Sequence, residues 1–363
     1  MATSENKIFD DLVLDYVGFY VSDLVATKRW WTDSFGFSVY AKGEDSVGLG
    51  SNRIHLLLTE PDEDHPGSGY LAKHGDGVSD IALRTADAAG AYEEAVRRGA
   101  TPISAPSRDG DTITATIGGF GDVAHTFVQR TGGADERALP GLRPVPVGTS
   151  GPGTYSLGEV DHFAVCVDAG TLDATVEFYE RVLDFELIFI ERIEVGAQAM
   201  TTKVVQSRSG SVTFTLIEPD VKCEPGHIDG FLKDHDGAGV QHIAFTTDNI
   251  VAAVDAVQNN GVEFLSTPAM YYRILPERVE LARYTVDELK QYNVLVDEDH
   301  DGQLYQIFTK SVHPRNTIFM ELIERLGART FGSGNIASLY EAVELERQRA
   351  EAEAAGGQEA AAA

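Results

Sequence analysis

The two halves of this chain carry the same sequence motifs in the same order. Residues 75–82 (GDGVSDIA) match residues 237–244 (GAGVQHIA), and residues 54–61 (IHLLLTEP) match residues 212–219 (VTFTLIEP). Internal repeats strongly constrain the fold of a chain, because each copy is expected to form the same structural unit. The chain is therefore predicted to contain two copies of one scaffold.

The matched runs predict the first elements of each copy. A strand is expected near Asp15 and again near Asp161, each followed by a helical pattern with an aromatic pair, in residues 26–37 and 174–185. Further strands should follow each helix, because both halves continue with β-rich runs that end in Glu-Pro.

The second part of each copy repeats this order. Ala- and Val-rich helices are expected in residues 86–99 and 248–261, each closed by a glycine suited to a left-handed C-cap. A short strand ending in a proline, Pro106 or Pro268, should follow each helix. Each half is thus predicted to hold two strand–helix–strand–strand–strand (βαβββ) modules that form an open, barrel-like sheet, an α+β fold with few helices.

Composition changes along the chain predict the domain boundaries. Residues 1–131 form the first domain, and residues 132–154, rich in Gly and Pro, form a linker without an apolar period. Residues 155–346 form the second domain, and residues 347–363 lack large apolar side chains and are expected to be disordered. The second domain should close with a helix capped near Ser333. Its apolar stripe is Ile336, Leu339, Tyr340 and Val343.

Charge and cysteine content exclude several classes of function. The chain has 57 acidic and 29 basic residues, a formal charge of −28, which repels nucleic acids and anionic membrane surfaces. It shows no signal-peptide core and no apolar run of membrane-spanning length, so we expect a cytoplasmic protein. Its two cysteines, Cys166 and Cys223, are expected to be free thiols, with Cys166 in the core.

Three residues of the second half, His162, His242 and Glu321, stand in apolar, strand-like runs and are candidate metal ligands. In the first half Tyr16 stands where His162 would be and Asp80 where His242 would be. Two imidazoles and one carboxylate are typical of non-haem Fe(II) oxygenases. A single strand histidine is more often a core or surface residue, but a ligand set present in one copy alone favours one metal centre per chain.

The remaining histidines and Glu324 are not expected to act in catalysis. Glu324 should lie on the face of its strand opposite to Glu321 and pair with a surface base. Solvated or structurally satisfied roles are expected for His55, His65, His74, His125, His235, His300 and His313.

Four motifs carry a resemblance to a known family. They are residues 237–244 (GAGVQHIA), 303–310 (QLYQIFTK), 317–325 (TIFMELIER) and 331–336 (FGSGNI). With the duplication they resemble the 4-hydroxyphenylpyruvate dioxygenase and 4-hydroxymandelate synthase family, within the vicinal oxygen chelate superfamily, over nearly everything from Asp15 to about Glu346.

This resemblance implies two tandem vicinal-oxygen-chelate domains, the second of them catalytic, and a homodimer. It assigns Fe(II) to His162, His242 and Glu321, and it places Gln241 and Gln306 near the substrate. The implied substrates are 4-hydroxyphenylpyruvate and O2, and the products are CO2 with either homogentisate or 4-hydroxymandelate.

Pocket positions that differ within the family favour the synthase branch. Thr215, Ile217 and Tyr340 resemble its pattern and differ from the usual dioxygenase residues, although neutral drift on a shared pocket is an alternative. Thr202 replaces a usual serine, and His227 replaces a usual glutamine, with either a pocket or a surface role. The expected product is therefore 4-hydroxymandelate, formed by oxidative decarboxylation and benzylic hydroxylation.

Three other functions stay open at this point. The first is a 4-hydroxyphenylpyruvate dioxygenase that forms homogentisate. The second is a metal-free small-molecule binding protein of the same fold, which would have no reason to keep a ligand set in one copy. The third is an isomerase or lyase that uses nickel or zinc.

Overall fold

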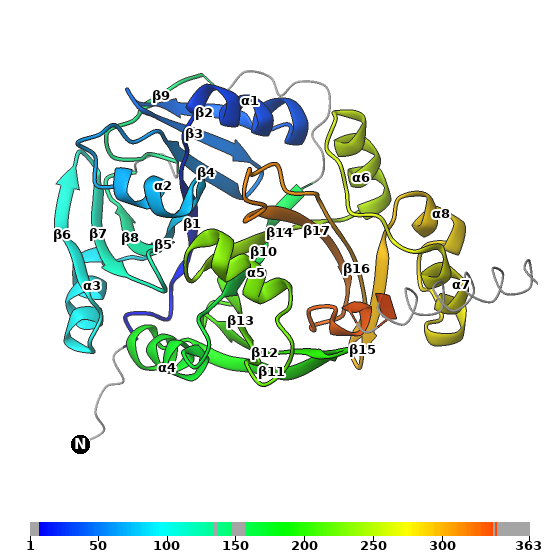
Figure 1. Cartoon of the computed structure of the whole chain (residues 1–363). Coiled ribbons are helices and arrows are strands. Elements are labelled where there is room, and N and C mark those ends of the chain that lie inside the picture. The colour runs from blue at the N-terminus through cyan, green and yellow to red at the C-terminus, as the bar shows by residue number, and fades with distance from the viewer. Residues whose placement is uncertain (1–6, 134–136, 147–156, 337, 340–363) are drawn as a thin grey trace, which may run out of the picture.

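The computed structural model describes residues 7–133, 137–146, 157–336 and 338–339. Two curled sheets lie side by side, and most helices pack on their outer surfaces (Figure 1). The first half contains β1 (Val13–Tyr20), α1 (Leu24–Phe35), β2 (Ser38–Lys42), β3 (Ser46–Ser51), β4 (Ile54–Thr59), α2 (Ser68–His74), β5 (Gly77–Arg84), α3 (Ala88–Arg97), β6 (Pro102–Asp109), β7 (Thr112–Gly118), β8 (Ala124–Arg130) and β9 (Arg143–Pro144). The second half contains β10 (Leu157–Cys166), α4 (Leu172–Leu183), β11 (Glu186–Val195), β12 (Gln198–Gln206), β13 (Thr213–Pro219), α5 (His227–His235), β14 (Gly239–Thr247), α6 (Ile250–Asn259), α7 (Ala269–Arg278), α8 (Val286–Gln291), β15 (Leu295–Asp299), β16 (Gly302–Phe308) and β17 (Phe319–Leu326).

The strand order confirms the duplication. The first sheet runs β6-β7-β8-β5-β1-β4-β3-β2-β9, and the second, read from its opposite edge, runs β15-β16-β17-β14-β10-β13-β12-β11. Without β9 the two orders are the same when strands are matched by their place in the repeat. Both sheets pair two modules through an antiparallel centre, β1 with β5 and β10 with β14. The predicted α+β fold of paired βαβββ modules is confirmed.

Four of the five predicted helices are present as α1, α3, α4 and α6, and the fifth, the C-terminal helix, is described at residues 333–336 and 338–339. The ends of α1 and α4 follow local chemistry. The Asp23 side chain accepts a hydrogen bond from the backbone N–H of Ala26 at 2.8 Å, which caps the start of α1. Gly36, with φ of 71°, and Asp184, with φ of 54°, end α1 and α4 in the left-handed region.

The predicted strands that end at Pro106 and Pro268 are wrong in detail. Strand β6 continues past Pro106, because it is the edge strand of its sheet and a missing N–H there costs no ladder hydrogen bond. In the second half only an isolated bridge joins Phe264 to Thr309, and Pro268 precedes α7 instead. The sequence also gave no prediction of α2, α5, α7 or α8.

The described part of the predicted linker joins the first sheet. Strand β9 pairs with β2, and Leu139 packs in a buried cluster with Tyr16 and Tyr40. These side chains fill the inside of the first curl. The domain boundaries themselves stay a prediction. The proposed tail, residues 347–363, lies outside the described residues.

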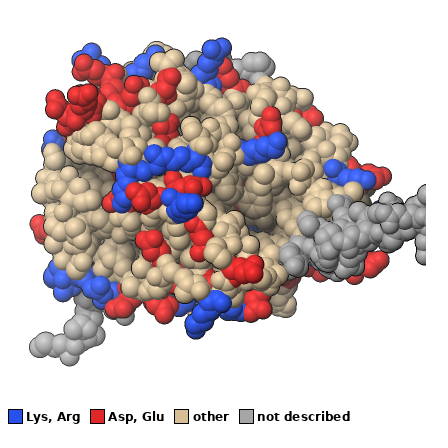
Figure 2. Space-filling model, viewed as in Figure 1, with Lys and Arg blue, Asp and Glu red and all other residues tan. Residues whose placement is uncertain are grey.

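The second curl is more open. Figure 2 shows a hollow right of centre, over the region where Figure 1 places the inner face of the second sheet. Ala164, Cys166 and Ile217 form part of a buried cluster along this sheet, together with Phe231 of α5. Cys166 and Cys223 are both free thiols, and Cys166 is fully buried, as predicted. Among the described helices, none is long and apolar enough to cross a membrane.

Candidate metal centre and substrate pocket

His162, His242 and Glu321 come from three adjacent strands at the centre of the second sheet, β10, β14 and β17. Ala244 of β14 pairs with His162 on one side and with Glu321 on the other, so the two ligands flank a small side chain at one level of the sheet. His242 lies two residues from Ala244, on the same face of β14. The fold therefore directs the three side chains to one point inside the curl.

The distances within this trio suit a metal ion. Glu321 Oε2 lies 3.2 Å from His242 Nε2 and 3.4 Å from His162 Nε2. Ligands about 2.1 Å from a metal in adjacent coordination positions stand about 3 Å apart. Within the described part of the chain, this is the one group of three or more His, Cys, Asp or Glu side chains that converges this closely.

The burial of the trio also favours a metal. Glu321 is 2% exposed and His162 is 3% exposed, and an unpaired buried carboxylate is costly. Burial lowers the pKa of His242, although the nearby Glu321 carboxylate opposes this shift. Neutral imidazole is the form that binds metals. The residues fit a divalent cation held by two nitrogens and one oxygen.

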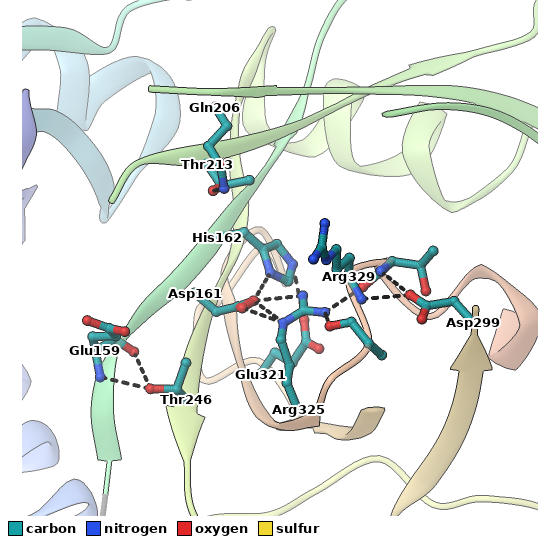
Figure 3. A network of polar contacts seen from close by, with 12 residues as sticks. Glu159, Asp161, His162, Gln206, Thr213, Thr246, Asp299, Glu321, Arg325 and Arg329 are labelled. Atoms are coloured by element: carbon teal, nitrogen blue, oxygen red, sulfur yellow. Dashed lines mark hydrogen bonds and ion pairs between the residues drawn. The ribbon is translucent and has the colours of Figure 1, made fainter. Parts of the chain in front are cut away.

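Asp161 and Arg325 support His162 from outside the trio. An Asp161 oxygen lies 3.3 Å from His162 Nδ1, and Arg325 donates to both Asp161 oxygens (Figure 3). Burial would raise the pKa of Asp161, but the hydrogen bonds from His162 and Arg325 outweigh it and hold that pKa well below its usual range. An ionised Asp161 favours the His162 tautomer with its proton on Nδ1, which leaves the Nε2 lone pair for the metal.

Several buried polar atoms near the metal centre have no hydrogen-bond partner. Thr215 Oγ1, His242 Nδ1 and Gln306 Oε1 are among them, and so is Asn335 Nδ2 at the start of the C-terminal helical turn. Buried polar groups are rarely left unsatisfied, so each one needs an explanation. A polar ligand inside the curl would explain those that face it.

Three predicted pocket residues share a face with the metal ligands. Thr215 pairs with Ala164, which in turn pairs with His242, so the Thr215 and His242 side chains point to the same side of the sheet. Ile217 lies two residues further along β13, and it pairs with Thr202 of β12. These residues form a wall that leads away from His242.

Gln306 and Gln241 reach the face of the metal ligands in different ways, Gln306 through regular strand pairing and Gln241 through a register shift. Gln306 pairs with Ile323, which is two residues from Glu321 and so on the same face. Gln241 is next to His242, where simple alternation would turn it away, but the register shifts opposite Ala164 and Val165. Such bulges re-aim side chains. Both glutamines are buried, whereas Tyr340 lies outside the described residues.

The outcomes for the other polar residues are mixed. His227 begins α5 and its side chain is exposed, while partial desolvation and the nearby His242 lower its pKa. The alternatives of a pocket role and a surface role for His227 both stay predictions. Glu324 pairs with an exposed base, Arg283, as predicted, although Glu324 itself is only 2% exposed. It also accepts hydrogen bonds from Tyr284 Oη and the Ile250 N–H, so it caps α6 from the core.

A sequence model of known families matches both halves. The Glyoxalase/Bleomycin resistance protein/Dioxygenase superfamily matches residues 13–127 and 159–273. This chain belongs to that superfamily.

Its relatives narrow the family further. A 4-hydroxyphenylpyruvate dioxygenase from Dictyostelium discoideum is 30% identical, with 92% of this chain and 98% of the relative covered. One from Pyricularia oryzae is 31% identical, with 89% and 84% covered. A solved triple mutant of 4-hydroxymandelate synthase from Streptomyces coelicolor is 40% identical, with a TM-score of 0.82 over 93% of this chain and 99% of that one. The chain is thus a member of the 4-hydroxyphenylpyruvate dioxygenase and 4-hydroxymandelate synthase family.

In this member of the superfamily, sequence reasoning missed Asp161, Arg325 and Phe331. The Phe331 ring packs edge-on against His162, with centroids 5.1 Å apart. The signal that could have found the first two is the repeat itself, because Asp15 and Arg130 occupy the corresponding positions in the first half. A cavity of about 1360 Å³ between the two sheets reaches Asp161, Arg325 and Phe331 but none of the three metal ligands.

Proposed function

We propose that this chain is a non-haem Fe(II) dioxygenase that converts 4-hydroxyphenylpyruvate and O2 into 4-hydroxymandelate and CO2. The observation that carries the proposal is the convergence of His162, His242 and Glu321 at one buried point inside the open curl. The 40% identity to a 4-hydroxymandelate synthase supports the choice of reaction.

The residues of the pocket would have distinct roles. When bound, Fe(II) would supply the redox chemistry by which O2 releases the substrate's carboxylate as CO2 and adds an oxygen atom to the benzylic carbon. His162, His242 and Glu321 would hold the ion on one side and leave the other side to the substrate. Thr215, Gln241 and Gln306 would orient the substrate by hydrogen bonds, since Thr215 Oγ1 and Gln306 Oε1 have no partner in the free protein.

Ile217 would contribute to the choice of product. It is 8% exposed and belongs to an apolar cluster with Cys166 and Met200. An apolar wall here offers the substrate ring no hydrogen bond, so the ring position depends on shape alone at this point. Because a small displacement decides which carbon reaches the activated oxygen, the wall can favour the benzylic carbon over the ring.

The test is to load the purified protein with Fe(II), supply 4-hydroxyphenylpyruvate under air, and identify the aromatic product. 4-Hydroxymandelate and homogentisate are isomers, so they must be separated by chromatography against standards and not by mass alone. We expect 4-hydroxymandelate. Glu321→Gln should abolish O2 uptake, and Asp80→Asn, at the position that corresponds to His242 in the first half, should retain it.

The alternative reaction is that of a 4-hydroxyphenylpyruvate dioxygenase. The curated relatives that are 30% and 31% identical carry that name. Homogentisate as the main product would establish this alternative and overturn the synthase. Absence of substrate-dependent O2 uptake would overturn both.

We also propose a homodimer located in the cytoplasm. The family resemblance supports the dimer, and light scattering of the purified chain would test it. A monomer at micromolar concentration would overturn this part of the proposal and leave the reaction unaffected.

A further inference from the structure

We propose that Arg325 is a positioning residue for the metal centre, which holds the ligand His162 from two sides. This inference rests on the metal site of the proposed function. Arg325 lies on β17 four residues after Glu321, and its side chain is 21% exposed. It does not reach the metal point itself and would act through its neighbours.

The first side is the Asp161 carboxylate. Arg325 Nε lies 2.9 and 2.8 Å from the two Asp161 oxygens, and Nη2 lies 2.8 Å from Oδ1. A planar guanidinium that binds a carboxylate at two points fixes its plane as well as its position. Since Asp161 also contacts His162 Nδ1, the orientation of the imidazole is fixed in turn (Figure 3).

The second side is the Phe331 ring. The Arg325 guanidinium carbon lies 5.2 Å from the centre of this ring, within the range of a cation–π contact, and the ring packs against His162. Arg325 Nη1 donates to the carbonyl oxygens of Ala328 and Thr330, at 3.2 and 2.6 Å, and so holds the loop that carries Phe331. One guanidinium therefore fixes both groups that enclose the imidazole.

The first half contains a natural control for this arrangement. Arg130 also forms a double contact with Asp15, through Nη1 and Nη2, and it donates from Nε to the Ala138 carbonyl at 3.0 Å. Asp15 precedes Tyr16 as Asp161 precedes His162, yet among the described hydrogen bonds none joins the side chains of Asp15 and Tyr16. The Asp–Arg pair thus belongs to the repeated scaffold, and only its copy in the second half touches a candidate metal ligand.

This difference defines a matched pair of variants, Arg325→Lys and Arg130→Lys. Both keep the charge and remove the planar, two-point contact. The full-length proteins would be freed of metal and titrated with Co(II), whose visible absorption reports the geometry of its ligands. We expect Arg325→Lys to raise the Co(II) Kd by about 10- to 100-fold and to alter the spectrum, as loss of an outer hydrogen bond to a metal-bound histidine does. Arg130→Lys should leave both within about threefold of the parent.

Two further measurements separate positioning from stability. Thermal unfolding of the metal-free variants should show similar losses, since both lose the same pair. Asp161→Asn keeps an oxygen near His162 Nδ1 but loses the two-point contact with Arg325, because an amide offers one acceptor oxygen, so it should weaken Co(II) binding about as much as Arg325→Lys does.

The outcomes are distinguishable. Equal Co(II) affinities and spectra for the two lysine variants, whether unchanged from the parent or equally weakened, would overturn the role of Arg325. If the parent protein itself binds no Co(II) or Fe(II), the metal centre of the proposed function fails first, and the inference fails with it.

Discussion

Tyr16 Oη donates a hydrogen bond to Asp80 Oδ2 at 3.1 Å, and these two residues stand in the first sheet where His162 and His242 stand in the second. The third position, that of Glu321, is taken by Thr126, whose backbone N–H donates to Asp80 Oδ1 at 3.0 Å. The first copy therefore joins the three positions by hydrogen bonds, whereas the second places two imidazoles and a carboxylate there, close enough together to hold a metal ion. One scaffold thus carries two kinds of chemistry at the same three positions.

The half-buried Asp80 is expected to make a pH-dependent contribution to stability. Burial raises its pKa to about 6, although hydrogen bonds from Thr126 and Tyr16 oppose the shift. Between about pH 4 and pH 6 the folded state keeps a proton on Asp80 that the unfolded chain has lost. The contribution of Asp80 to the free energy of unfolding therefore falls as pH rises from about 4 to 6, and it is constant above that range. The difference in unfolding free energy between Asp80→Asn and the parent should therefore increase in favour of the variant by about 1 kcal/mol when pH is raised from 5 to 7.5. Urea denaturation at both pH values measures this, and Asp64→Asn at an exposed site is the control.

A second prediction concerns metal removal. A ligand that binds only the folded state adds about 2.7 kcal/mol of stability at 100 times its Kd. Chelation should therefore lower the melting temperature, and adding back Fe(II) or Co(II) in the absence of O2 should restore it. Glu321→Gln should show no metal-dependent shift, because the variant lacks the only carboxylate of the trio. A full shift in this variant would place the metal elsewhere.

The contact between the halves gives a third prediction. His125 is fully buried, with Nδ1 bonded to the Ile81 carbonyl at 3.0 Å and Nε2 bonded to Tyr179 Oη, from the other half, at 2.7 Å. Burial lowers the pKa of His125 to about 4, so the ring is neutral and Nε2 accepts from Tyr179. Tyr179→Phe leaves this acceptor unsatisfied and should cost about 1–3 kcal/mol in urea denaturation. Tyr292→Phe, whose hydroxyl bonds Asp255 at the surface, should cost less than about 0.5 kcal/mol.

Thr215 gives a prediction in which stability and binding move in opposite directions. Its hydroxyl is buried without a partner in the free protein, so Thr215→Val should be neutral or stabilising by thermal unfolding. The same change should raise KM for 4-hydroxyphenylpyruvate, because a substrate contact is lost. Thr213→Val on the same strand is the contrast, since Thr213 Oγ1 accepts a hydrogen bond from Gln206 at 3.0 Å. That variant should lose stability, and an unchanged KM for Thr215→Val would remove Thr215 from the pocket.

The sequence predicted most parts of the fold that occur in both halves, and the exceptions are α2 and α5, which occupy corresponding places but were not predicted. The βαβββ modules, the helices α1, α3, α4 and α6, and the convergence of the metal trio all follow from motifs present in both halves or absent from one. Helices α7 and α8 have no counterpart in the first half, so no second copy pointed to them. The contact of Arg325 with Asp161 joins residues 164 positions apart, and only the folded sheet brings them together.

The last prediction concerns the choice of product, which depends on where the substrate ring lies in the pocket. Ile217 lies in the apolar wall, whereas the place of Tyr340 in the pocket is a prediction from the sequence alone. Ile217→Asn would place an amide where the substrate ring meets only hydrocarbon, and Tyr340→Phe would replace a phenol by an unsubstituted ring. Together they should shift the product from 4-hydroxymandelate toward homogentisate, read as the ratio of the two isomers by chromatography, with a smaller shift for each single change. Because both products consume one O2 per substrate, O2 uptake and CO2 release should stay coupled one to one while the ratio changes. An unchanged ratio in the double variant, with coupling intact, would show that product choice depends on other residues.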